Sequence, residues 1–133
     1  MPVYLEPVTT PSEQDLIDLT KLYADYPTPL NFAELQAALT DDNSLTLYGA
    51  RFNGRLLGAI SLKAEDNTAL LNHLCVRKVT RQRTVGRELL RLILDKTDFR
   101  QYRLESCIDD AALDALFSKM GFSKTGNCYS LQR

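Results

Sequence analysis

The sequence is poor in the residues that would mark a metal centre, a disulfide-bonded protein or a membrane protein. It has a single histidine, and its three cysteines, Cys75, Cys107 and Cys128, are an odd number with no C-x-x-C pair. This pattern argues against a disulfide framework and against a zinc site, so we expect reduced thiols in a core. No apolar run approaches the ~18 residues of a membrane span, and no basic segment precedes an apolar one at the N-terminus. We therefore expect a cytoplasmic protein without a metal or a membrane contact.

Neither sign of charge predominates, because 16 basic residues face 17 acidic ones and the net charge is −1. The distribution is uneven, since residues 77–91 carry a net charge of +5, which leaves −6 for the rest of the chain. The cations of this basic segment are Arg77, Lys78, Arg81, Arg83, Arg87 and Arg91. With 133 residues, 44% hydrophobic, and no break in composition, the chain is expected to form one domain over residues 1–133.

The spacing of apolar residues changes between strand-like and helical along the chain. Strands are predicted over residues 3–8, 45–52, 55–63, 68–76, 102–107 and 128–131. Helices are predicted over residues 11–23, 31–39, 85–97 and 110–122. Ser12 is the expected N-cap of the first helix, and Gly121 is expected to close the last one. The order of elements indicates an α+β fold whose sheet contains one parallel β-α-β unit.

Asn53-Gly54 separates the two strand-like runs at 45–52 and 55–63. Both residues of a type I′ turn need positive φ values, and Asn-Gly adopts them readily. A β-hairpin is therefore expected here.

The basic segment joins a predicted strand to a predicted helix. The start of a helix exposes unpaired N–H groups and carries partial positive charge, so it can bind an anion such as a pyrophosphate. Gly86 in the first turn would let a ligand approach the backbone, and Thr84 could cap the helix. A solvated helix face explains the arginines equally well from spacing alone. Nucleic acid is a more distant alternative, because residues 77–97 contain no aromatic residue to stack on bases.

Residues 81–86, which read RQRTVG, resemble the [QR]-x-x-G-x-[GA] acetyl-CoA loop of the GNAT acyltransferases. Residues 117–122, FSKMGF, are similar to the closing FYxKxGF helix of that family. The resemblance covers nearly the whole chain and implies a three-layer α+β fold. Its central sheet would be mixed and mostly antiparallel, with one splayed strand and helices on both faces.

The same resemblance implies that acetyl-CoA is the cofactor and identifies the residues that hold it. In this family the splayed strand pairs with pantetheine, and the loop and helix start bind the pyrophosphate. The residues concerned are Leu74, Cys75, Val76, Thr80, Arg81, Gln82, Arg83, Thr84, Val85, Gly86 and Arg87.

Within the family, three segments resemble the subfamily of acetyl-CoA sensors that promote maturation of aspartate decarboxylase. They are SEQDLIDLTKLYADY, ARFNGRLLGA and VRKVTRQRTVG. The resemblance implies that the decarboxylase proenzyme is a partner and that Arg51 and Asn53, in the hairpin, contact it. We expect the turn to hold these residues at the rim of the sheet, away from the cofactor loop.

An active N-acetyltransferase acting on an unidentified amine is the alternative, and an anion-binding module without CoA is a third. The resemblance places Phe117 where the family commonly has a tyrosine acid, and Leu70 where it often has an acidic residue. His73 and Glu105 are the candidate bases, although strand alternation puts His73 on the face opposite Leu74. Phe117 also has helical spacing typical of a core aromatic. These features favour a binding protein over a catalyst.

Overall fold

The computed structural model describes residues 4–8, 11–24, 36–37, 45–76, 85–105, 115, 117–126 and 128–132. Of the helix predicted over 31–39, only Gln36 and Ala37 fall within these ranges, and both are helical. The start of the helix predicted over 110–122 lies outside them.

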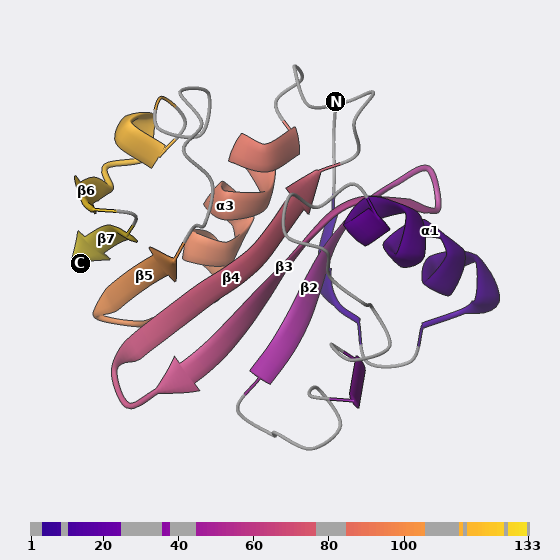
Figure 1. The fold of residues 1–133 in the computed structure, drawn as a ribbon, viewed down its shortest axis with the longest axis horizontal. Coiled ribbons are helices and arrows are strands. Elements are labelled where there is room, and N and C mark those ends of the chain that lie inside the picture. Colours follow the sequence, from indigo (N-terminus) through magenta and orange to yellow (C-terminus); the bar gives the residue numbers. More distant parts are fainter. Residues whose placement is uncertain are drawn as a thin grey trace.

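A seven-stranded sheet forms the centre of the molecule, in the order β1-β2-β3-β4-β5-β7-β6 (Figure 1). The strands are β1 (Tyr4–Pro7), β2 (Leu45–Phe52), β3 (Arg55–Glu65), β4 (Thr68–Val76), β5 (Gln101–Glu105), β6 (Ser123–Thr125) and β7 (Cys128–Gln132). The helices whose bounds lie within the described residues are α1 (Glu13–Ala24) and α3 (Val85–Lys96). Among the described strands, only β4 and β5 pair in parallel, and α3 connects them. The mixed, mostly antiparallel sheet and its single parallel β-α-β unit are confirmed.

Ser12 begins α1 as predicted. Its hydroxyl accepts a hydrogen bond from the backbone N–H of Asp15 at 3.1 Å, and the Asp15 carboxylate accepts one from the N–H of Ser12 at 3.2 Å. This reciprocal pair satisfies two of the N–H groups that a helix start leaves without partners.

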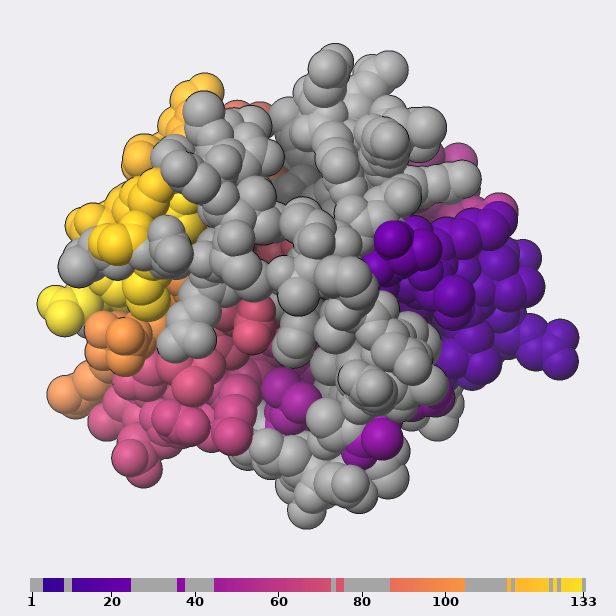
Figure 2. All heavy atoms as spheres, in the orientation of Figure 1, coloured from indigo at the N-terminus to yellow at the C-terminus, as the bar shows by residue number. Residues whose placement is uncertain are grey.

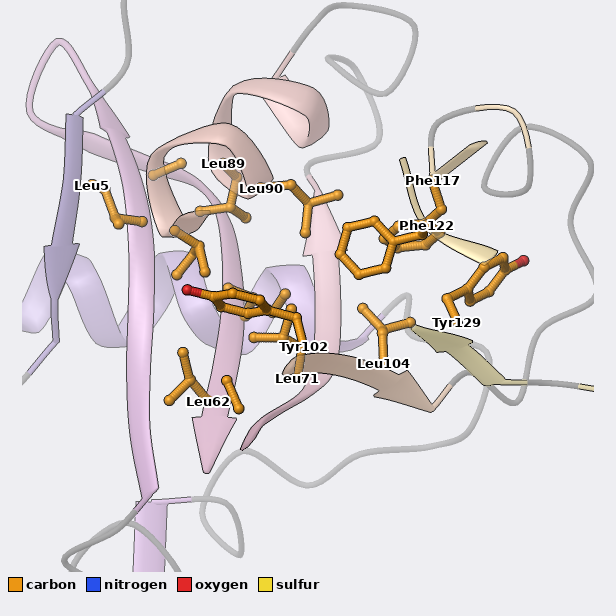
Figure 3. Close-up of a cluster of buried hydrophobic side chains, with 14 of the residues drawn as sticks. Leu5, Leu62, Leu71, Leu89, Leu90, Tyr102, Leu104, Phe117, Phe122 and Tyr129 are labelled. Carbon is orange, nitrogen blue, oxygen red and sulfur yellow. The ribbon is translucent and has the colours of Figure 1, made fainter. Parts of the chain in front are cut away.

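The two helices cover opposite faces of the sheet. Leu89, Leu90 and Ile93 of α3 are buried in the larger core cluster, which Figure 3 shows together with Leu71, Tyr102 and Tyr129 from the sheet. On the other face, Leu19, Leu22 and Tyr23 of α1 pack against Leu47, Leu56, Ala59 and Cys75. In Figure 2, α1 forms one flank of the viewed face and the C-terminal strands form the opposite flank. No described helix is long and apolar enough to cross a membrane.

The β2–β3 hairpin has the predicted turn, because Asn53 and Gly54 have φ values of 50° and 78°. Earlier in the hairpin, Gly49 allows a close approach of the chain. A Cβ atom at Gly49 would lie 2.8 Å from Cδ2 of Leu56 and 3.2 Å from Cγ2 of Val8. The absence of a side chain at this position therefore lets these two residues pack over β2.

Gly121 closes the last helix as predicted, with a φ of 94°. The N–H of Phe122 donates to the carbonyl of Phe117 at 2.9 Å, and the N–H of Gly121 donates to that of Ser118 at 3.1 Å. These two bonds form a Schellman motif, and the Phe117 and Phe122 rings meet at 5.4 Å between centroids. The short strand β6 that follows was not predicted. It pairs with β7 across a turn in which Gly126 has a φ of 62°.

Candidate functional site

A β-bulge interrupts β4 in the segment predicted to bind the cofactor. Cys75 pairs with Ala59 and Asn72 with Ser61, so His73 and Leu74 together oppose Ile60. The extra residue changes the alternation of side chains. Leu71 and Leu74, three residues apart, both contact the core on the α3 face, whereas Cys75 lies in the core on the α1 face.

Strand β4 also parts from β5 at this point. Among the described residues, their parallel register runs from Thr68↔Gln101 to Leu71↔Leu104, whereas β4 continues to Val76. The last residues of β4 therefore have β3 on one side and no described strand on the other. An opening of this kind exposes backbone N–H and C=O groups that an extended ligand can bind.

Cys75 is buried on the α1 side of this strand. Its thiol donates a hydrogen bond to the carbonyl of Leu22 at 2.9 Å, and its exposed fraction is 5%. The prediction of a core thiol is confirmed for Cys75, and the contact ties the end of α1 to the bulged strand. Cys128 is half-buried, and Cys107 lies outside the described residues.

Helix α3 begins at Val85, so Gly86 stands in its first turn as the motif requires. Arg87 is exposed. Thr80, Arg81, Gln82, Arg83 and Thr84 lie outside the described residues, and so do the side chains of Val76 and Val85. The roles assigned to these residues stay predictions.

Part of the positive charge counted in the basic segment is neutralised within α3. Arg91 donates to Glu88 at 2.7 Å and to Asp95 at 3.1 Å. The Arg91 guanidinium beside Glu88 lowers the pKa of that carboxyl. Arg91 therefore belongs to a solvated, ion-paired helix face, which was the alternative interpretation of these arginines.

The hairpin and the candidate cofactor strand lie at the same end of the sheet. Gly58 pairs with Val76, and β3 runs antiparallel to β4, so the Asn53-Gly54 turn lies just beyond the carboxyl end of β4. Figure 1 shows both, together with the start of α3, at the upper end of the molecule. Residues 77–84 lie outside the described part of the chain, so the expected separation of the turn from the cofactor loop stays a prediction.

Arg51, predicted to contact a partner, is engaged within the chain. Its Nε donates to Glu6 at 2.8 Å, and its Nη1 and Nη2 donate to the two Asp15 oxygens at 3.0 and 3.1 Å. Nη1 also donates to the carbonyl of Gly54 at 2.9 Å, and Nη2 contacts Glu6 as well. These contacts match the five N–H groups of the guanidinium. They join β1, α1 and the hairpin turn.

A second ion pair lies one helical turn further along α1. Arg55 donates to Asp18 from Nε at 3.0 Å and from Nη2 at 2.6 Å. Asp18 also accepts from Gln14 and from the backbone N–H of Leu56. Hydrogen bonds from Arg51 and Arg55 lower the pKa values of Asp15 and Asp18, although burial of both carboxyls opposes the shift.

The sequence contained a signal for these pairs that was not recognised. Asp15 and Asp18 share the spacing of Leu19 and Leu22, which places two carboxylates on the buried face of α1. Such acids need cationic partners, because an unpaired buried charge is unfavourable. Asn53 is exposed at the turn, and its predicted contact with a partner stays a prediction.

The candidate catalytic residues are not brought together by any described contact. The side chains of His73 and Glu105 lie outside the described part of the chain, and the bulge removes the alternation used to orient His73. Phe117 is fully buried, with the Tyr129 ring at 4.5 Å between centroids. Its interpretation as a core aromatic is confirmed.

Residues 2–130 match the family described as the PanZ acetyltransferase (GNAT) domain. The chain is 32% identical over 115 residues to the PanD regulatory factor of Salmonella typhimurium, covering 84% of each protein. It is 39% identical over 83 residues to the PanD regulatory factor of Escherichia coli, covering 62% of this chain and 59% of that protein. The solution structure of E. coli YhhK bound to coenzyme A superposes with a TM-score of 0.81, at 28% identity and full coverage of both chains. This chain belongs to the PanZ family of GNAT domains.

Proposed function

We propose that the protein binds acetyl-CoA between the end of β4 and the start of α3, and that it regulates aspartate decarboxylase in response to this cofactor. The observation that carries the first part is the bulge at His73-Leu74 combined with the separation of β4 from β5 beyond Leu71. These features leave backbone groups of β4 without a second strand at the position where the family binds its cofactor.

The described residues are compatible with a thioester cofactor that carries a pyrophosphate. Among Leu74, Cys75 and Val76, the residues whose backbone N–H and C=O groups point away from β3 would bind the pantetheine arm. Gly86, in the first turn of the 12-residue helix α3, adds no Cβ atom to crowd a pyrophosphate at the helix start. The residues preceding Val85 would complete the phosphate site as the family motif implies. YhhK, which is similar over its whole length, was solved with coenzyme A bound.

A regulatory role is favoured over catalysis by two observations. Phe117, which stands where the family commonly has its tyrosine acid, has no proton to donate and is fully buried. Two relatives are PanD regulatory factors, and the family match spans residues 2–130. The hairpin lies at the same end of the sheet as the cofactor strand, so a decarboxylase docked on the hairpin would lie close to bound acetyl-CoA.

Cofactor binding is tested by thermal unfolding with and without acetyl-CoA. A ligand that binds only the native state stabilises it by about 2.7 kcal/mol at a hundredfold excess over Kd. Gly86→Glu should abolish this shift, because it introduces bulk and negative charge at the expected pyrophosphate position. Ser123→Glu, at an exposed position of β6, is the control for the added charge. An unchanged melting temperature of the wild-type protein in millimolar acetyl-CoA would refute the cofactor assignment.

The regulatory assignment is tested by binding of the decarboxylase proenzyme with and without acetyl-CoA. Binding that strengthens with acetyl-CoA, and faster self-cleavage of the proenzyme, are expected. Absence of binding under both conditions, together with thiol release from acetyl-CoA in the presence of an amine panel, would instead support an N-acetyltransferase.

A further inference from the structure

The two arginines of the β2–β3 hairpin differ in how much of their hydrogen-bonding capacity the chain itself uses. Arg51 binds two carboxylates, Glu6 and Asp15, and one carbonyl, that of Gly54. Its side chain is 23% exposed. Arg55 binds one carboxylate, Asp18, and its side chain is 41% exposed. Among the described residues, Arg55 therefore has donors without an acceptor, whereas every Arg51 donor has one.

The unused donors of Arg55 form a fork. Nε and Nη2 donate to Asp18, so one edge of the planar guanidinium is occupied. Both N–H groups of Nη1 and the second N–H group of Nη2 have no acceptor among the described residues. One hydrogen on each of these nitrogens points the same way, and this pair matches the two oxygens of a carboxylate.

We infer that Arg55, rather than Arg51, is the hairpin residue that binds the regulated partner, and that it does so by a bidentate contact to a carboxylate of that partner. This inference rests on the proposed regulatory function and assigns its recognition residue. Arg51 then has a structural role, because it holds the hairpin against α1 and β1. Arg51 shows that one guanidinium in this hairpin can bind two carboxylates at once, because it binds Glu6 along one edge and Asp15 along another. We expect Arg55 to bind Asp18 and the partner carboxylate in the same way.

Asp18 prepares Arg55 for this contact. Asp18 is 5% exposed and is fixed by the backbone N–H of Leu56 at 3.3 Å and by Gln14 at 3.1 Å. An arginine held by a fixed carboxylate loses less side-chain freedom when it binds a second one. The partner carboxylate would be a C-terminal group or an Asp or Glu side chain.

The charges around Arg55 determine which rate constant of partner binding should change when the contact is lost. Three carboxylates, Glu6, Asp15 and Asp18, and two guanidiniums give the network a net charge of −1. A network of this charge does not attract a carboxylate over a long range, so the contact acts at short range. Its loss should raise the dissociation rate and leave the association rate nearly unchanged.

The test measures binding kinetics of the immobilised decarboxylase proenzyme in saturating acetyl-CoA. Asp18→Asn/Arg55→Gln replaces the ion pair by a neutral hydrogen-bonding pair, and Arg55→Lys keeps the charge but removes the fork. The matched control is Lys63→Gln/Glu65→Gln, which neutralises an exposed pair at the other end of β3. Thermal unfolding and acetyl-CoA affinity are measured for each variant to show that it is folded.

Both Arg55 variants should lose about tenfold or more in partner affinity through faster dissociation, while the control binds like the wild type. The carboxylates of the partner are then neutralised one at a time. One of these changes should weaken binding to the wild-type protein but not weaken binding to the Arg55 variants any further. Wild-type affinity in folded Arg55 variants, or the lack of any coupled partner carboxylate, would overturn the inference and leave the regulatory function standing. Absence of wild-type binding would refute the regulatory function itself.

Discussion

Arg51→Ala is expected to destabilise the protein strongly, contrary to the behaviour of an ordinary surface arginine. The substitution removes both hydrogen bonds to Asp15, a carboxylate whose side chain is 10% exposed and would remain charged at neutral pH. The family resemblance implies that Arg51 contacts a partner, and the loss of a residue with that role alone would be expected to leave folding intact. The contacts with Glu6, Asp15 and Gly54 overturn that expectation about folding.

The magnitude follows from the burial of the pair. Breaking a buried ion pair by removing one partner costs about 3–5 kcal/mol, and the 23% exposure of Arg51 favours the lower end. The contact with Glu6 adds little, because Glu6 is 42% exposed and water screens it. A loss of about 3 kcal/mol in a chain of this length lowers the melting temperature by about 12 °C.

Thermal and urea unfolding of Arg51→Ala and Arg51→Lys would measure this loss. Lysine keeps a charge near Asp15 but only part of the hydrogen bonding, so an intermediate stability is expected. Asp15→Asn/Arg51→Ala should be more stable than Arg51→Ala alone, because it removes the unpaired buried charge. A melting temperature of Arg51→Ala within about 2 °C of the wild type would refute the structural role of this guanidinium.

Three further predictions concern acid stability and packing. The pKa values of Asp15 and Asp18 are lower in the folded protein than in the unfolded chain, so these two carboxylates stabilise the fold. This contribution is fully present above the unfolded carboxyl pKa of about 3.9 and is lost as the pH falls through the pKa values of the folded protein. Urea unfolding at a series of acid pH values should therefore show a weaker pH dependence in Asp15→Asn/Asp18→Asn than in the wild type. Gly49→Ala should cost about 1–3 kcal/mol by overpacking against the buried side chain of Leu56, seen as a lower urea midpoint with an unchanged m-value. Phe117→Tyr should cost about 1–3 kcal/mol in the same assay, because its hydroxyl would be buried at a fully enclosed position; unchanged stability would mean that a partner for the hydroxyl exists.

Local signals in the sequence predicted the elements that depend on neighbouring residues. The Asn53-Gly54 turn, the Ser12 cap and the Gly121 helix end each follow from the conformational preferences of one or two residues, and all three are confirmed. The spacing of apolar residues similarly predicted the start of α3 at Val85, and the order of the elements predicted the parallel β-α-β unit.

Features that depend on distant residues were not predicted. Arg51 and Glu6 are 45 positions apart, and no local pattern pairs them. The bulge at His73-Leu74 lies within a run of strand-forming residues that is indistinguishable from a regular strand. Strand β6 has three residues and was too short for an alternation to be recognised.

Lys96, at the end of α3, binds the backbone of the edge strand β1. Its Nζ donates a hydrogen bond to the carbonyl of Leu5 at 3.1 Å. In the β1–β2 pair, Leu5 lies opposite Ala50, and the N–H of Val8 donates to the carbonyl of Leu47 at 2.8 Å. That register directs the backbone groups of Leu5 and Pro7 away from β2. Proline has no N–H to offer, and the lysine occupies one of the remaining acceptors. The edge strand β1 is thus protected against pairing with a strand of another chain, so self-association into extended β-structure is disfavoured there.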